Sequence, residues 1–70
     1  MARLSPRERQ VLELLAHGLS ATAVAHELGL SSETVRTHVR NAMRKLDATT
    51  RVQAVAIAVE SGAISSSAPH

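Results

Sequence analysis

The chain contains no cysteine and no phenylalanine, tyrosine or tryptophan. Without cysteine it can form neither a disulfide nor a Cys-based zinc site. Without aromatic rings it lacks the stacking platforms with which proteins bind RNA and single strands. Its apolar runs fall far short of the roughly 20 residues that a membrane-spanning helix needs, and no signal-peptide core follows Met1. These absences predict a small cytoplasmic protein with no membrane partner.

Signatures of catalysis are also missing. The chain has no glycine-rich phosphate loop, no nucleophile beside a matching base and no pair of inward-facing carboxylates. His17, His26 and His38 lack the spacings that metal sites use. We therefore expect no enzymatic activity, no cofactor and no bound metal.

Positive charge is concentrated in one segment. The formal net charge is only +2. Residues 33–51, however, carry five basic side chains against Glu33 and Asp47, whereas the rest of the chain carries three basic and four acidic ones. This imbalance predicts an anionic partner for that segment alone. Its basic residues are Arg36, Arg40, Arg44, Lys45 and Arg51.

Hydrophobic residues recur at spacings of three and four, and neither strand alternation nor a hairpin signal is present. The sequence therefore predicts an all-α fold. Helix-capping signals divide it into four helices, of which the third spans about residues 32–46. We expect one domain over residues 1–63 and a disordered polar tail over residues 64–70. Glycines at 18, 29 and 62 are expected to end the first, second and fourth helices. The expected N-caps are Ser5, Ser20, Ser31 or Ser32, and Thr50.

The buried faces follow from helical spacing. The third helix has the clearest apolar stripe, and the stripe of the first helix is interrupted by Glu8. Glu8 has two interpretations, either as the second member of a capping box with Ser5 or as the partner of Arg51 in a buried ion pair. The stripe residues of the third helix are Val35, Val39, Ala42, Met43 and Leu46.

The fourth helix is apolar on every side. We expect Ala54, Ile57 and Ala58 to face the core, which leaves a second stripe exposed. We interpret that second stripe as a homodimer surface, and the alternative is a face covered by another domain. Its residues are Val52, Val55, Ala56 and Val59.

Only Gly29, Leu30 and Ser31 separate the second and third helices, so the pair is typical of a helix-turn-helix. The face of the third helix opposite its apolar stripe then lies in solvent. A charged helix face is often no more than a solvated surface. Because this one lies on the second helix of the motif and within the basic segment, we interpret it as a reader of the DNA major groove.

The order of these blocks resembles the LuxR-type domain, also called NarL/FixJ-type. The resemblance spans residues 4 to about 62 and rests on Leu4-Ser5-Pro6-Arg7-Glu8, Gly18-Leu19-Ser20, Ala25-His26-Glu27-Leu28-Gly29-Leu30-Ser31, Thr34-Val35-Arg36-Thr37-His38, Arg44-Lys45-Leu46 and Thr50-Arg51. It implies a four-helix helix-turn-helix domain of a response regulator or quorum-sensing regulator of transcription. Such a domain binds double-stranded DNA as a homodimer through its fourth helix, and RNA polymerase is a further partner.

The resemblance also implies residue roles. Arg36, Thr37 and Arg40 match base-facing positions. Where many members have Lys followed by Glu at the start of the second helix, this chain has Thr22 and Ala23, so a cationic phosphate contact is lost or replaced by the Thr22 hydroxyl. The residues expected to contact phosphate are Thr22, Ser31, Ser32, Thr34, Arg44 and Lys45.

Two alternatives remain at this point. The first is a promoter-binding module similar to region 4 of sigma factors, which uses a comparable helix-turn-helix. The second is a dimerisation or protein-interaction module that does not bind DNA. Dimerisation through the fourth helix would favour the LuxR type over the first alternative, and salt-sensitive binding of duplex DNA would exclude the second.

Overall fold

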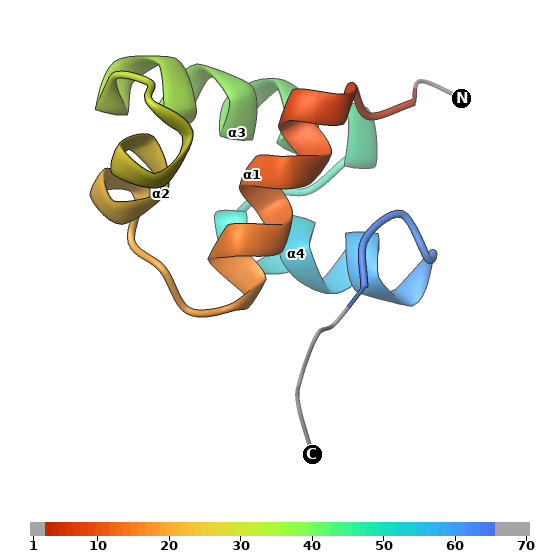
Figure 1. Ribbon diagram of the computed structural model, residues 1–70. Coiled ribbons are helices and arrows are strands. Elements are labelled where there is room, and N and C mark those ends of the chain that lie inside the picture. Colours follow the sequence, from red (N-terminus) through yellow and green to blue (C-terminus); the bar gives the residue numbers. More distant parts are fainter. Residues whose placement is uncertain (1–2, 66–70) are drawn as a thin grey trace.

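The computed structural model describes residues 3–65, and within them it contains four helices and no strand. α1 and α3 each contact every other helix, whereas α2 and α4 do not contact each other (Figure 1). The predictions of an all-α fold and of four helices are therefore confirmed. In chain order the helices are α1 (Pro6–Ala16), α2 (Ala21–Leu28), α3 (Ser32–Leu46) and α4 (Arg51–Glu60).

Each helix begins with a hydroxyl side chain that accepts a hydrogen bond from the backbone amide three residues later. This bond satisfies one of the donors that the first turn of a helix leaves unpaired. The bonds are 3.0–3.1 Å long. The predicted N-caps are correct, with Ser31 rather than Ser32 capping α3. The four N-caps are Ser5, Ser20, Ser31 and Thr50.

The N-terminus of α4 forms only half of a capping box. The amide of Gln53 donates to the Thr50 hydroxyl, but the Gln53 side-chain oxygen does not return to the Thr50 amide. It accepts instead from the backbone nitrogen of Thr49 at 2.7 Å and from the Thr49 hydroxyl at 2.8 Å. The start of α4 is thus held to the residue before its cap.

The core consists of two adjacent clusters. One lies between α1, α2 and α3 and the other between α1, α3 and α4, so that α3 contributes to both. Burial of these apolar side chains supplies most of the stabilisation of so short a chain. The buried residues are Val11, Val24, Ala25, Val35 and Val39 in the first cluster, and Leu12, Ala42, Ala54, Ala58 and Ile64 in the second.

The second cluster corrects two expectations about the end of the chain. Ala54 and Ala58 are buried as predicted. The partly buried valines of α4 that pack against the cluster are Val55 and Val59, whereas Ile57, expected in the core, does not pack against it. Ile64, assigned to the tail, is only 4% exposed and packs in the same cluster. The chain turns back after α4, with the amide of Ala63 donating to the carbonyl of Ala58. The remainder of the predicted tail, residues 66–70, lies outside the described residues.

Candidate nucleic-acid interface

The orientation of α3 is set by the bend that joins it to α2. Gly29 ends α2 in the left-handed region, at φ 68° and ψ 34°, where only glycine carries no steric penalty. The amide of Leu30 donates to the carbonyl of Ala25 at 2.8 Å, which closes the turn. Leu30 is half-buried against the first core cluster, so it holds the corner of the bend in place. The predicted turn between the two helices is present.

The solvent side of α3 carries the basic residues. Arg36, Thr37 and Arg40 are all exposed, whereas Val35 and Ala42 of the same helix are buried. The guanidinium groups form no ion pair with any residue of the described part of the chain. The hydroxyl of Thr37 donates to the Glu33 carbonyl at 3.1 Å, so its proton is already used. The methyl group and the lone pairs of Thr37 remain for an external partner.

The start of α3 forms a second polar area. The Ser31 hydroxyl bonds both the amide and the hydroxyl of Thr34, at 3.0 and 2.8 Å. These bonds leave the earlier amides of the first turn without a side-chain acceptor, and amides at a helix N-terminus favour an anion. Thr22 is exposed in the first turn of α2. Of the residues expected to contact phosphate, Ser31, Thr34, Thr22 and Arg44 are exposed, and Ser32 is half-buried.

Lys45 is the exception among the expected contacts, because it is already paired. Its Nζ lies 2.8 Å from Glu8 Oε1, an oxygen that also accepts from the Ser5 amide at 2.9 Å. Burial acts to raise the pKa of Glu8, but the Lys45 hydrogen bond, the Ser5 amide and the Lys45 charge together lower it below its ordinary value. Glu8 therefore serves both as the capping-box residue and as an ion-pair partner.

The predicted partner of Glu8 was wrong. Glu8 pairs with Lys45, and Arg51 is exposed at the start of α4. Sequence spacing could not distinguish the two cations, since the choice depends on how α3 and α4 pack against α1. Arg51 is consequently a basic surface residue of the segment for which the charge pattern predicts an anionic partner, although it was not among the residues expected to contact DNA.

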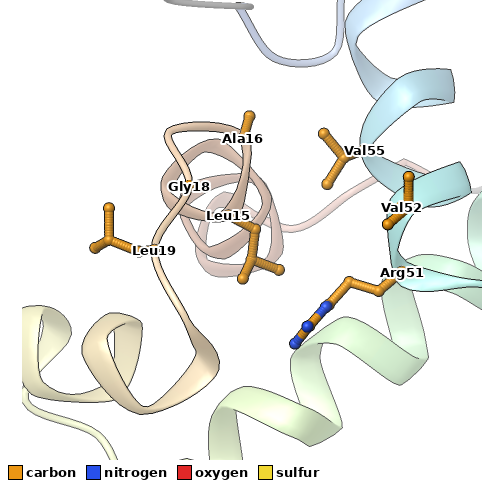
Figure 2. Close-up of a pocket in the computed structure, with 7 residues that line it drawn as sticks. All are labelled: Leu15, Ala16, Gly18, Leu19, Arg51, Val52 and Val55. Carbon is orange, nitrogen blue, oxygen red and sulfur yellow. The ribbon is translucent and has the colours of Figure 1, made fainter.

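Two shallow hollows meet at Arg51. The first, of about 280 Å³, lies between the end of α1 and the start of α4, and Figure 2 shows the Arg51 side chain extending from α4 to a position below Leu15. The second, of about 260 Å³, has Arg51 on its border together with Arg36 and Arg40 of α3. Arg51 thus joins the basic surface of α3. The other residues that line the first hollow are Ala16, Gly18, Leu19, Val52 and Val55, and those of the second are Ala21, Val39 and Met43.

The face of α4 that was expected to be exposed is only partly so. Val52 is 77% exposed and Ala56 is exposed, whereas Val55 and Val59 are half-buried against the second core cluster. Val52 is the large apolar side chain that protrudes most clearly among the described residues.

Residues 3–65 contain neither a metal-binding cluster nor a helix that could span a membrane. No group of three or more His, Cys, Asp or Glu side chains there is arranged to hold a metal ion. No helix within that range combines the length and the hydropathy needed to cross a bilayer.

Comparison with known proteins gives concordant matches. A model of the family described as "Bacterial regulatory proteins, luxR family" matches residues 2–58. The chain is 48% identical over 52 residues to the spore germination protein GerE of Bacillus subtilis, covering 74% of this chain and 70% of GerE. The solved structure of transcription factor GerE superposes with a TM-score of 0.87 at 32% identity, covering 94% of this chain and 98% of that one.

Longer regulators match over a similar segment. The chain is 42% identical over 62 residues to the transcriptional regulatory protein FixJ of Azorhizobium caulinodans, and 38% identical over 52 residues to the nitrate/nitrite response regulator protein NarL of Escherichia coli. These alignments cover 89% and 74% of this chain, but only 29% of FixJ and 24% of NarL. The chain therefore spans about a quarter of the length of these relatives.

Proposed function

The chain belongs to the luxR family of bacterial regulatory proteins, whose helix-turn-helix domain binds DNA, and from this premise we propose that its α3 reads base sequence in the major groove. Membership of this family decides against the sigma-factor module and against an interaction module without DNA. The base-reading residues in this proposal are Arg36, Thr37 and Arg40.

The observation that carries the proposal is a pair of exposed guanidiniums on α3 that form no ion pair within residues 3–65. Arg36 and Arg40 are exposed one helical turn apart along α3, with Arg36 at the edge of the solvent face, so both can face the same groove. An α-helix fits the major groove of B-DNA, where arginine can donate two hydrogen bonds to one guanine. Thr37 lies beside them and offers its methyl group to a thymine.

Phosphate contacts set the position of α3 in this proposal. The first turns of α2 and α3 present hydroxyls and backbone amides to the DNA backbone, and Arg44 adds a charge further along α3. Lys45 contributes less than the sequence suggested, because its charge is compensated by Glu8. The proposed contacts are Thr22, Ser31, Ser32, Thr34 and Arg44, with Lys45 in a minor role.

We propose a homodimer formed through α4, which would place two copies of α3 on a two-fold related site. The support is Val52, exposed at 77%, next to exposed Ala56. Val55 and Val59 form the base of this face and are shared with the core. A small apolar face of this kind is stabilised when a second copy covers it.

In the intact regulator we propose that this domain is the effector part of a transcription factor of the response-regulator or quorum-sensing type. FixJ and NarL are named as regulators and are longer than this chain, which supports this role. RNA polymerase is then a partner of the bound regulator, and the cytoplasmic nucleoid is its location, because the proposed target is chromosomal DNA.

The test is a fluorescence-anisotropy titration of labelled random-sequence duplex at several salt concentrations, followed by selection of preferred sites from a random pool. We expect the logarithm of the binding constant to fall linearly with the logarithm of the salt concentration. The selection should enrich a two-fold related sequence. Absence of salt-sensitive binding would overturn DNA binding. Binding without any enriched sequence would overturn base reading by α3.

A further inference from the structure

Arg51 opens α4, outside the recognition helix, but it borders the same hollow as two arginines of that helix. The hollow of about 260 Å³ is bordered by Arg36 and Arg40 of α3 and by Arg51 of α4, with Ala21, Val39 and Met43 as its apolar lining. Arg51 is exposed, and within residues 3–65 it forms no ion pair. Three cationic side chains from two helices therefore converge on one open site.

Among the described residues, no carboxylate lines this hollow to balance the three charges. Like charges gathered in one place repel each other, and an anion bound between them would remove that cost. Ala21 brings the first turn of α2 to the hollow, and the Ser20 hydroxyl accepts only from the Ala23 amide there. The earlier amides of that turn add partial positive charge on the same side. The electrostatics of the site thus select an anion.

We infer that this hollow binds one backbone phosphate of the duplex that α3 enters, with Arg51 as its anchoring residue. The inference rests on the proposed function, because the phosphate belongs to the DNA strand that runs along the edge of α3. A guanidinium is suited to this ligand since it can donate two parallel hydrogen bonds to phosphate oxygens. Arg51 contacts no base in this arrangement, so it contributes affinity and register but no sequence preference.

The comparison with Lys45 strengthens the assignment. Both residues lie in the basic segment, but Lys45 Nζ is 2.8 Å from the Glu8 carboxylate, whereas Arg51 has no carboxylate partner in the described part of the chain. A cation that is already compensated releases fewer counterions from DNA than one that is free. Arg51 therefore supplies the sequence-independent contact that the LuxR-type resemblance implies for Lys45.

The experiment compares the salt dependence of binding for four proteins with the labelled random-sequence duplex. These are the wild type, Arg51→Gln, Arg51→Met, which keeps the aliphatic stem, and Arg9→Gln, which removes the same charge from an exposed position on α1. Circular dichroism verifies that each variant retains its helical content. We expect the slope of log affinity against log salt to become shallower by about 0.9 for both Arg51 variants, the value for one phosphate contact. The slope of Arg9→Gln should equal that of the wild type.

The phosphate site would be overturned if the slope of log affinity against log salt were the same for Arg51→Gln and Arg51→Met as for Arg9→Gln. A loss confined to the selected sequence, with random duplex unaffected, would also overturn it, because Arg51 would then read a base. If the wild type itself shows no salt-dependent binding, the proposed function fails as well, and that result is distinct from failure of the Arg51 site alone.

Discussion

Lys45 Nζ and Glu8 Oε1 lie 2.8 Å apart and join the last turn of α3 to the first turn of α1 across 37 positions of sequence. The same carboxylate oxygen accepts the Ser5 amide, so one side chain both caps α1 and anchors α3. Glu8 is 5% exposed, which reduces screening of the pair by water. The position of the recognition helix is thus coupled to the start of the domain by a single buried carboxylate.

Replacing Lys45 with methionine should destabilise the domain. Lys45→Met keeps the length of the side chain but removes the charged hydrogen bond to Glu8, a type of bond that contributes about 1.5–3 kcal/mol. Urea denaturation followed by circular dichroism measures the change in the free energy of unfolding. Arg44→Met is the control, because Arg44 is exposed on the same turn and has no carboxylate partner among residues 3–65. Equal stability of the two variants would show that the ion pair contributes nothing.

Stability should fall in acid through Glu8. Its pKa is lowered in the folded state from an ordinary value of 4.5. The folded state therefore releases the Glu8 proton more readily than the unfolded state does. The resulting stabilisation is present above pH 4.5 and is lost as the pH falls through the lowered folded-state pKa. The free energy of unfolding of the wild type, measured in urea at a series of acidic pH values, should approach that of Glu8→Gln in this range. A difference between the two proteins that is independent of pH would contradict this role.

Removal of Arg40 should weaken sequence preference rather than general affinity. Arg40→Ala deletes the proposed bidentate contact with one base pair, so binding to the selected site should weaken by about 1–3 kcal/mol. Random duplex should lose much less. Fluorescence anisotropy with both duplexes gives the ratio of the affinities for the selected and the random sequence. Equal losses of affinity for the two duplexes would mean that Arg40 contacts only the DNA backbone. Arg40→Lys keeps the charge but not the planar fork, and should lose most of the preference as well.

A charge at Val52 should prevent dimerisation while the fold is retained. Val52 is 77% exposed, so Val52→Asp is tolerated in the monomer but would bury an unpaired carboxylate in the dimer. Sedimentation at several protein concentrations measures the dimer dissociation constant. This constant should rise by about tenfold or more, because each 1.4 kcal/mol of lost binding free energy corresponds to a factor of about ten. Gln10→Glu adds the same charge at an exposed position of α1 and serves as the control. A wild type that remains monomeric at every concentration would contradict the proposed interface.

The local parts of this structure could be predicted from the sequence. The N-caps at Ser5, Ser20, Ser31 and Thr50 form hydrogen bonds that span only three residues, so the residue types at those spacings determine them. The stripe of α3 was equally clear, because polar residues separate its apolar positions. The bend at Gly29 required only a short connection and a residue that tolerates positive φ.

The parts that depend on packing could not be predicted in the same way. The partner of Glu8 is fixed by the relative placement of three helices, and two cations of the basic segment were compatible with it. In α4 the apolar run has no polar residue to mark the outer face, so Ile57 was assigned to the core in place of Val55 and Val59. Ile64 was missed because it follows the glycine that ends α4, and an apolar residue there can fold back onto the helix.

The contact between α3 and α4 is lined by alanines at 42, 54 and 58, all of them fully buried. Such small side chains let two backbones approach closely, and a bulkier residue at Ala54 would push α4 outward. In a dimer joined through α4, that displacement would change the distance between the two reading helices. The small size of three interior alanine side chains would then determine which half-site spacing the regulator accepts.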